Sequence, residues 1–472
     1  MTSDLTEQTL FELTRTLASR KASSREITDG FLARIAKANG KLHAFVDVFT
    51  DEARAFADAA DRKQATGLKL GPLHGLPIAF KDLCDIEGRV TTGGSKMNER
   101  RVSPTTSATV ERLLAAGMVP LGKLHMVEFA FGGWGTNPLM GAPWNPWDLA
   151  THRVPGGSSS GTGVAVAARL APAGIGSDTG GSVRIPCALN NLVGLKTTHG
   201  RISLHGTLLL SHSLDTIGPM ARCVEDCALI FQALCGPDPR DPYTLAAPPP
   251  TDFLAAAVKP QSIAGSRIAF PDSSQLPDFV HPDVTGAWQA AAETLRKIGA
   301  NVIETRLPDW YFDLSRSAGY IVTSELFHYQ REVIEDMSKP IGPAVRTRAQ
   351  AAKTYPASAY AAALIEREQR RREIAHWFES FDAILLPSFG LPAIPLDEVD
   401  EASPIPGFLT RPANYLGHCA MSMPAGFSKG LPIGIQLVGK PYAETTVLRL
   451  ARAYQDATEF HKQKPKLEAI GL

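Results

Sequence analysis

Several features are missing from this 472-residue sequence, and each absence excludes a class of protein. The charges balance, with 48 Lys+Arg against 48 Asp+Glu, whereas a dedicated nucleic-acid binder usually carries a basic excess. No stretch approaches the ~20 apolar residues that span a membrane. The N-terminus also lacks the basic start and apolar core of a signal peptide. We therefore expect a cytoplasmic protein that binds neither nucleic acid nor membrane.

Cysteine and nucleotide-binding motifs are scarce as well. The six cysteines form no Cys-x2-Cys pair, and Cys223 and Cys227 have no histidine at zinc-finger spacing. This predicts reduced thiols and no metal site. The glycine-rich segment contains neither Gly-x4-Gly-Lys-Ser/Thr nor Gly-x-Gly-x-x-Gly, and we expect no cofactor.

What the sequence does contain is a regular alternation of elements. Hydrophobic residues make up 44% and charged residues 20%, which excludes a disordered chain. From Leu76 onward, short apolar runs alternate with helical patterns, and this predicts an α/β sheet with helices packed on its faces. Before it, Ser23-x-x-Glu26 is typical of a helix N-terminus, and Asn39-Gly40 is expected to close that helix.

Glycine is concentrated in one place. Eight of the 40 glycines lie between Gly156 and Ser182, and residues 177–182 read Ser-Asp-Thr-Gly-Gly-Ser after a predicted strand. A serine at the end of such a turn can be a nucleophile, and the backbone N–H groups of the turn can stabilise an oxyanion. An isolated Gly-Gly-Ser is more often a tight structural loop, so this segment by itself does not decide.

A serine nucleophile needs a base. None of the 12 histidines sits in an obvious Asp/His arrangement, and a Gly-x-Ser-x-Gly elbow is missing, although chain order does not exclude a spatial triad. The other route is a lysine kept neutral by burial, together with a relay serine. The residues alone leave this choice open.

Separated segments of the chain resemble the motifs of the amidase signature family, in the order that the family has them. They are residues 75–82, 155–161, 177–186, 194–196, 213–222, 414–417 and 430–439. Several motifs in register over almost the whole chain make this resemblance specific. It implies the family's fold, a central mixed twisted sheet covered by helices on both faces. It also implies a free-standing bacterial-type amidase that acts on a small-molecule amide, and it leaves a homodimer open.

The resemblance also implies a Ser–Ser–Lys triad. Ser182 would be the nucleophile, and Ser158, after a cis peptide bond from Gly157, would relay its proton. Lys81 would be the neutral base. Because the reference pKa of lysine is about 10.4, burial and neighbouring groups must lower it substantially.

The same resemblance assigns the residues around the triad. Asp178 and Arg184 are expected to pair and brace the loop. A region from 309 to 354 should supply one wall of the substrate pocket. The oxyanion hole would consist of the backbone N–H groups of Thr179, Gly180, Gly181 and Ser182. Substrate-binding residues would be Phe131, Gly132, Gly133 and Trp134. The aromatic ring of Phe131 or Trp134 would suit an apolar or aryl substrate.

Three hypotheses about function follow. The preferred one is an amidase that hydrolyses a carboxamide through an acyl-enzyme, with carbamate or ester hydrolysis as an alternative at the same site. The A subunit of the aminoacyl-tRNA amidotransferase resembles the chain across the same motifs but commonly has Gln where Ile185 stands, so it ranks low. Intact Lys81, Ser158 and Ser182 disfavour a non-catalytic scaffold.

Length alone would suggest two or three domains, but the motifs make a single domain, 1–472, the better prediction. Within it we distinguish an N-terminal helical region (1–65), a catalytic signature core (70–235) and a proline-rich connection (236–262). A variable, mostly helical region on the substrate side (263–381) follows, and the chain then returns to the core sheet and a C-terminal helix (382–472).

Overall fold

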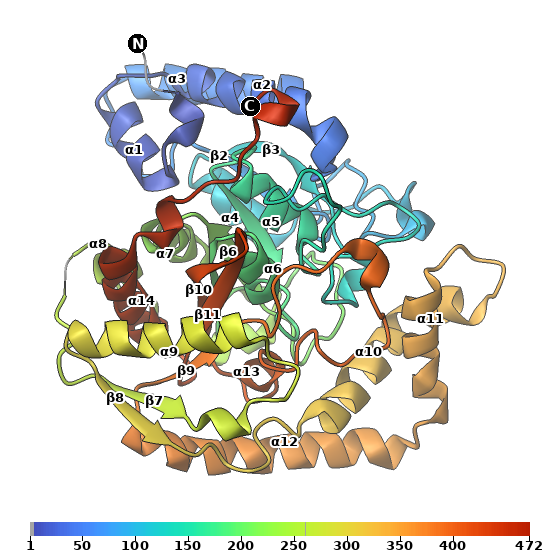
Figure 1. Cartoon of the computed structure of the whole chain (residues 1–472). Helices are drawn as coiled ribbons and strands as arrows, with labels where there is room; N and C mark the ends of the chain where they lie inside the picture. Colours follow the sequence, from blue (N-terminus) through green and yellow to red (C-terminus); the bar gives the residue numbers. More distant parts are fainter. Residues whose placement is uncertain (1–3, 260) are drawn as a thin grey trace.

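An 11-stranded mixed sheet forms the centre of the computed structural model, which describes residues 4–259 and 261–472 (Figure 1). The first three residues of the predicted N-terminal region and Pro260 of the proline-rich connection lie outside the described residues. In sheet order the strands are β1 (Phe45–Val48), β3 (Val119–Leu124), β2 (Pro77–Lys81), β4 (Ala173–Ser177), β6 (Ile217–Ala221), β5 (Val193–Lys196), β10 (Ala420–Ser428), β11 (Leu431–Gly439), β9 (Ala383–Pro387), β7 (Arg267–Pro271) and β8 (Asn301–Thr305).

The sheet contains two parallel parts. Strand β2 runs parallel to β3 and β4, and β7 runs parallel to β8 and β9, whereas the other pairs are antiparallel. Strands β2, β3, β4, β5, β6 and β9 are buried along their whole length. Continuous burial is what a strand shows when both faces of its sheet are covered.

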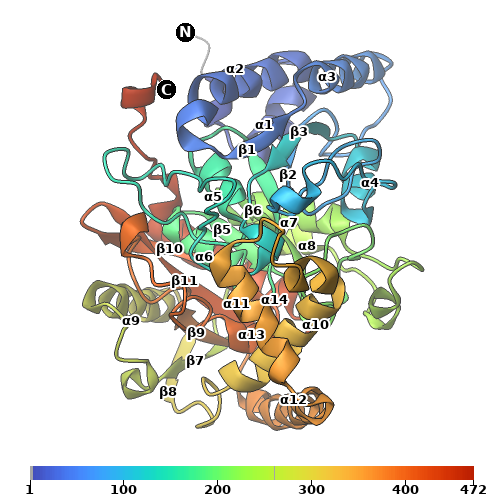
Figure 2. The same cartoon turned by 90° about the vertical axis from the view of Figure 1, so that its right-hand side faces the viewer.

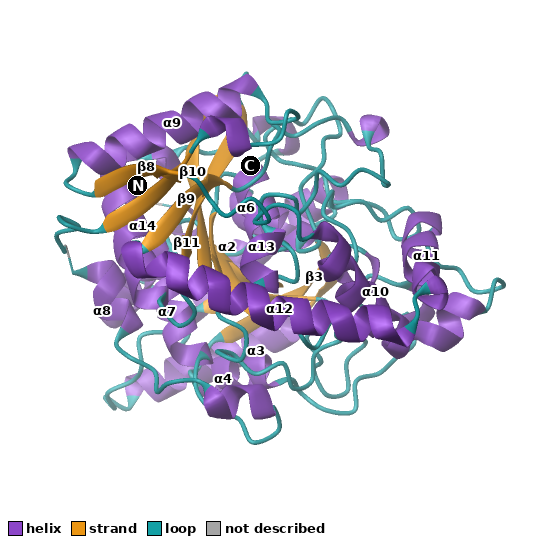
Figure 3. Ribbon diagram, turned by 90° about the horizontal axis from the view of Figure 1, so that it is seen from below, coloured by secondary structure: helices purple, strands orange, loops and turns teal. Residues whose placement is uncertain are grey.

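Helices cover both faces, as Figure 3 shows. Alternate residues of a strand point to opposite faces, and a Cβ on Gly434 would meet Ala188, whereas a Cβ on Gly439 would meet Val447. These two contacts place α6 and α14 on opposite faces. The covering helices are α5 (Ser160–Ala167) and α6 (Arg184–Leu189) on one side, with α7 (Val224–Leu234), α9 (Pro282–Lys297) and α14 (Glu444–Thr458) on the other. The predicted α/β class with a mixed sheet and two covered faces is confirmed.

The N-terminal helices α1 (Leu10–Ala18), α2 (Ser24–Leu42) and α3 (Thr50–Ala65) pack at one end of the sheet. The predicted capping box of Ser23 and Glu26 is present. The expected end of that helix at Asn39-Gly40 is wrong, because α2 continues to Leu42 and His43 takes the left-handed conformation. The Asn39 side chain instead exchanges hydrogen bonds with the backbone of Phe45, at 2.8 and 3.0 Å, and Leu42 is buried in the core.

A layer of three helices, two of them long, lies at the front and bottom of the view in Figure 2. It consists of α10 (Ser315–Glu335), α11 (Pro343–Gln350) and α12 (Ala357–Trp377). The short α13 (Arg411–Tyr415) lies between this layer and the sheet, and the remaining helices are α4 (Ala108–Ala115) and α8 (Phe253–Val258). The division into five regions stays a prediction. Strand β1 falls in the region that was expected to be helical, and α8 falls in the proline-rich connection.

No helix in the described part of the chain is both long and apolar enough to cross a membrane.

Candidate active site

Two parallel strands bring the candidate base to the centre of the sheet. Lys81 is the last residue of β2 and Ser177 the last residue of the neighbouring β4, so both lie at the same edge. Lys81 Nζ lies 2.8 Å from Ser177 Oγ and 2.7 Å from Ser158 Oγ. Ser158 precedes α5, and the peptide bond between Gly157 and Ser158 is cis, as the resemblance implied.

Lys81 is completely buried. Desolvation lowers the pKa of its amine to about 7, against the opposing attraction of Asp215, Cys84 and Asp178. Burial disfavours the charged form of a group, and here it outweighs the nearby negative charges. A large fraction of Lys81 is therefore uncharged near neutral pH, as a base must be.

Ser182 lies at the boundary between the core and a cavity, with 7% of its surface exposed. Its backbone carbonyl accepts a hydrogen bond from the N–H of Ser159, at 3.3 Å. Its hydroxyl has no hydrogen-bond partner among the described residues and faces the cavity. The structure thus brings Lys81 and Ser158 into direct contact but does not join Ser182 Oγ to Ser158.

The predicted ion pair of Asp178 and Arg184 is present, and solvent reaches neither side chain. Arg184 Nη2 lies 3.0 Å from Asp178 Oδ1, and Arg184 Nε lies 3.0 Å from Oδ2. Burial alone would raise the pKa of Asp178, but the guanidinium overrides it and holds the pKa well below its ordinary value. A buried pair with this bidentate geometry stiffens the loop between β4 and α6.

Two residues that the sequence left without a role complete this network. The Asn414 amide donates to the backbone oxygen and to Oδ1 of Asp178, both at 2.9 Å, and its own oxygen accepts from Arg184 at 2.6 Å. Gln436 accepts from Arg184 at 2.8 Å. Gln436 is fully buried and is a polar residue inside the otherwise apolar run of β11. This position in the sequence could have indicated that its side chain has a polar partner.

The glycine-rich turn presents backbone donors to the cavity. Gly181 has φ +128°, and a Cβ there would come within 2.1 Å of Thr410 Oγ1, so only glycine fits. Its N–H donates to Asp178 Oδ1 at 2.7 Å. The N–H groups of Thr179, Gly180 and Ser182 have no partner in the described part of the chain. Three of the four expected oxyanion donors are therefore free.

Asp215 is a further residue that sequence reasoning missed. It is 5% exposed, accepts a hydrogen bond from the Thr179 hydroxyl, and also accepts from the N–H groups of Leu210 and Ser211. Burial raises the pKa of its carboxyl to about 6. Because Asp215 also acts on the charge of Lys81, it links the base to the turn that carries the free amides.

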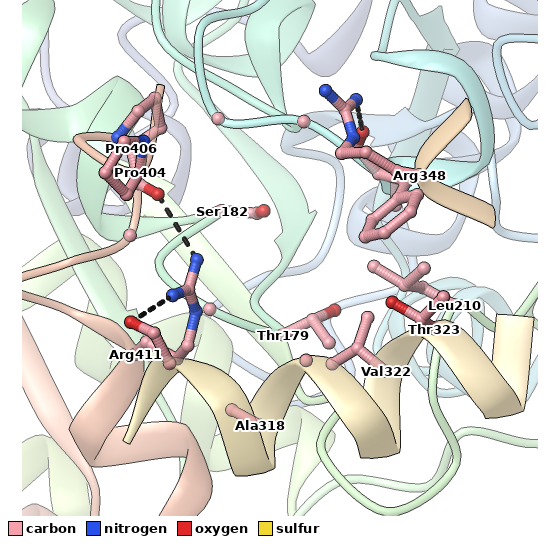
Figure 4. Close-up of a pocket in the computed structure, with 18 of the residues that line it drawn as sticks. Thr179, Ser182, Leu210, Ala318, Val322, Thr323, Arg348, Pro404, Pro406 and Arg411 are labelled. Carbon is pink, nitrogen blue, oxygen red and sulfur yellow. Dashed lines mark hydrogen bonds between the residues drawn. The ribbon is translucent and has the colours of Figure 1, made fainter. Parts of the chain in front are cut away.

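A cavity of ≈ 390 Å³ opens at Ser182. All four expected pocket residues line it, namely Phe131, Gly132, Gly133 and Trp134. Trp134 is only 4% exposed and packs edge-on against Phe389, so most of this ring belongs to the core. The region 309–354 supplies another wall of this cavity through Ser315, Ala318, Gly319, Val322, Thr323, Arg348 and Ala351. Figure 4 shows Ser182 facing this space above α10.

No group of three or more His, Cys, Asp or Glu side chains that could hold a metal ion occurs in the ranges 4–259 and 261–472. The six cysteines are free thiols, and all except Cys235 are buried.

The comparisons with known proteins agree with this geometry. Residues 26–448 match the amidase family. The A subunit of glutamyl-tRNA(Gln) amidotransferase from Azotobacter vinelandii is 40% identical over 97% of this chain and 99% of its own. A chain from an inhibitor-bound vestigial protein complex, described as revealing the evolutionary origins of an s-triazine catabolic enzyme, is 34% identical with a TM-score of 0.88, covering 95% of this chain and 98% of its own. The peptide amidase of Stenotrophomonas maltophilia is 30% identical with a TM-score of 0.84, and 98% of each chain is covered.

The chain belongs to the amidase signature family and is an enzyme that acts on C–N amide bonds. The low rank that Ile185 gave to the amidotransferase hypothesis needs correction. The relative from A. vinelandii belongs to that enzyme and is more similar in sequence than the solved amidase from S. maltophilia. A single side chain beside the glycine-rich turn was too little to decide between two hypotheses that share the same motifs.

Proposed function

We propose that the enzyme hydrolyses a carboxamide through an acyl-enzyme on Ser182, with Ser158 as proton relay and Lys81 as base. The observation that supports this most is the contact of 2.7 Å between the amine of Lys81, whose pKa is lowered to about 7, and Ser158 Oγ. A buried amine in that state can accept a proton from a hydroxyl.

In the first half of the reaction, Ser182 Oγ attacks the carbonyl carbon. Its proton passes to Ser158, and the Ser158 proton passes to the lone pair of Lys81 Nζ. Ser177 accepts an N–H of the same amine and so orients that lone pair. The carbonyl oxygen becomes an oxyanion, which the free N–H groups of the turn stabilise.

Collapse of the tetrahedral intermediate breaks the C–N bond. Ser158 returns a proton to the departing nitrogen, so that ammonia or an amine leaves and the acyl group stays on Ser182. A water molecule then attacks the ester carbon and gives its proton to Ser158, which relays to Lys81. The bond to Ser182 Oγ breaks, that oxygen regains a proton through Ser158, and the carboxylic acid is released. An ester or carbamate would react by the same steps, because only the leaving group differs.

A second candidate function has its own supporting observation. The relative that is 40% identical over 97% of this chain is a component of glutamyl-tRNA(Gln) amidotransferase. In this case the amide would be glutamine, and the chain would work with partner proteins on a charged tRNA. The chemistry at Ser182 would be unchanged, so the two candidates differ in substrate and assembly.

The replacement Ser182→Ala tests the proposal directly. We expect the variant to keep the thermal unfolding midpoint of the wild type and to lose hydrolysis of every accepted amide, measured as ammonia release. Turnover by Ser182→Ala at the wild-type rate would overturn the assignment of the nucleophile.

The two candidates are separated by a substrate series assayed with the isolated chain. Ammonia release from small amides, without partner proteins, supports the free-standing amidase. Release from glutamine alone, stimulated by added partner proteins, supports the amidotransferase.

A further inference from the structure

Two arginines line the cavity, and one of them is neutralised. Arg348 lies beside Glu401, with 3.2 Å between Nη1 and the carboxylate oxygen Oε2. It also donates to the backbone oxygens of Glu401 and Phe131, at 2.9 and 2.5 Å. Arg348 is thus held in place by its own protein partners, and its charge is balanced.

Arg411, at the start of α13, has neutral partners only. It donates to Ser315 Oγ at 2.9 Å and to the backbone oxygen of Pro406 at 3.4 Å. No carboxylate in the described part of the chain pairs with it, and burial is the sole influence on its pKa, which it lowers. A guanidinium stays protonated even so, so the wall carries one uncompensated positive charge.

The guanidinium of Arg411 has donors to spare. It carries five N–H groups, of which two are used. Its Nε makes no hydrogen bond in the described part of the chain and is not among the fully buried atoms that lack a partner, so this N–H is open to the cavity that Arg411 lines. A charge removed from bulk water without a counter-charge is destabilising, and a ligand that supplies a negative charge would relieve that cost.

Arg411 lies beside the turn that carries the free amides. Its neighbour Thr410 donates to the backbone oxygen of Gly180 at 2.7 Å, and a Cβ on Gly180 would lie 3.8 Å from Arg411 Nε. Figure 4 shows Arg411 and Arg348 on opposite sides of the space in front of Ser182. An anion at Arg411 would therefore lie only a few bonds from a carbonyl carbon attacked by Ser182.

The geometry points to a carboxylate subsite at Arg411, and thus to an amide substrate whose acyl part carries a second carboxylate. The monoamide of a short dicarboxylic acid has this form. The inference rests on the proposed function, in which the acyl group occupies this cavity and the leaving nitrogen lies toward Ser158. The apolar side chains Ile185 and Val322 in the same wall exclude water and strengthen the ion pair.

The test compares pairs of amides with the same shape. Malonamate, succinamate and glutaramate are each paired with the neutral amide in which an isopropyl group replaces the carboxylate. The measured quantity is the ratio of kcat/KM within a pair. We expect the wild type to prefer the acid in at least one pair by about 100-fold, and Arg411→Met to lose that preference. Arg411→Lys, which keeps the charge, should retain part of it.

Arg348→Met is the matched control, because Arg348 lines the same cavity but is already paired. We expect this variant to keep the ratio within about threefold of the wild type, since rim charges contribute little. A wild type that prefers the neutral amide in all three pairs would overturn the inference. So would an Arg411→Met enzyme with an unchanged ratio.

A binding measurement keeps the subsite separate from the reaction. Malonate, succinate and glutarate are titrated calorimetrically into Ser182→Ala, with and without Arg411→Met. Binding that Arg411→Met removes supports the carboxylate subsite even if no amide is hydrolysed, in which case only the proposed function fails. Absence of both turnover and binding overturns the subsite.

Discussion

Two ion pairs lie close to the candidate nucleophile, and solvent reaches them very differently. Arg184 and Asp178, in the loop between β4 and α6, are both 0% exposed, whereas Arg348 and Glu401, on the substrate side, are 28% and 31% exposed. The first pair is bound on every side by protein groups, including Asn414 and Gln436. The second is open to water and to the cavity.

Under the proposed mechanism, this difference separates the residues that carry out the reaction from those that select the substrate. Around Lys81 and Asp178 every charged group is fixed by buried partners, so a substitution there changes either the catalytic geometry or the stability of the fold. Around Arg348 and Arg411 the cavity wall consists of helices and a loop with partial exposure. A substitution there can change which acyl group fits while the catalytic loop stays intact. The following predictions test that contrast, from the largest expected effect to the smallest.

The largest effect is expected from Lys81→Met, which should lower kcat by about 10⁴-fold because the base is removed. Its control is Lys123→Met, since Lys123 is equally buried but lies 3.3 Å from the Asp82 carboxylate. The control should lose stability rather than four orders of magnitude in kcat. Steady-state kinetics and thermal unfolding separate the two effects. A Lys81→Met enzyme within tenfold of the wild type would show that another group is the base.

Asp178→Asn should come next, because it leaves the guanidinium of Arg184 buried without a counter-charge. We expect a loss of about 3–5 kcal/mol in the free energy of unfolding, measured by urea denaturation. A loss below about 1 kcal/mol would mean that the buried pair does not brace the loop, and the contrast between the two regions would disappear.

The effect of pH should be smaller, with kcat/KM falling about tenfold per pH unit below the pKa of Lys81. The pKa of Lys81 is lowered to about 7, and the uncharged amine is the active form. The value of kcat/KM should therefore be constant above pH 7 and fall as Lys81 becomes protonated below it. A flat profile between pH 5 and 8, with the protein still folded by circular dichroism, would contradict a lysine base.

Glu401→Gln should have the smallest effect. Its pair with Arg348 is partly exposed, and such pairs contribute about 1 kcal/mol or less. The free energy of unfolding should fall by no more than this in the same urea experiment as Asp178→Asn. A loss as large as that of Asp178→Asn would mean that the substrate side is as rigid as the catalytic loop.

Much of the fold was predictable where local patterns decide it. The capping box at Ser23 and Glu26 sets the start of α2, as its spacing predicted, and the strand predicted before the glycine-rich turn is β4. Strand β1 was not predicted, because residues 1–65 were expected to be helical. Strands β1, β5, β6 and β10 are short or rich in glycine and small residues, and they become strands because neighbours in the sheet supply their hydrogen bonds.

The candidate site was predictable to the extent that motifs carry it. The resemblance named Lys81, Ser158 and Ser182 as candidates, of which the first two are in contact. It also named the partnership of Asp178 with Arg184, which the structure contains. Asp215 could not be given a role, because its contact with Thr179 joins residues 36 positions apart. The sequence could not indicate a role for Arg411 either, because it does not show which groups surround this side chain in space.

By itself the sequence determined the family of this protein, through ordered motifs on an α/β chain: a glycine-rich turn, a serine at its end, and a lysine on an apolar strand. The tertiary structure decided which charges are balanced. Burial lowers the pKa of Lys81 only because β2 lies inside a sheet covered on both faces. Arg411 lacks a counter-charge only because of how α13, α10 and the loop at Pro406 meet. Whether a charge is balanced depends on the groups that lie near it in space, and these groups can be far away in the sequence.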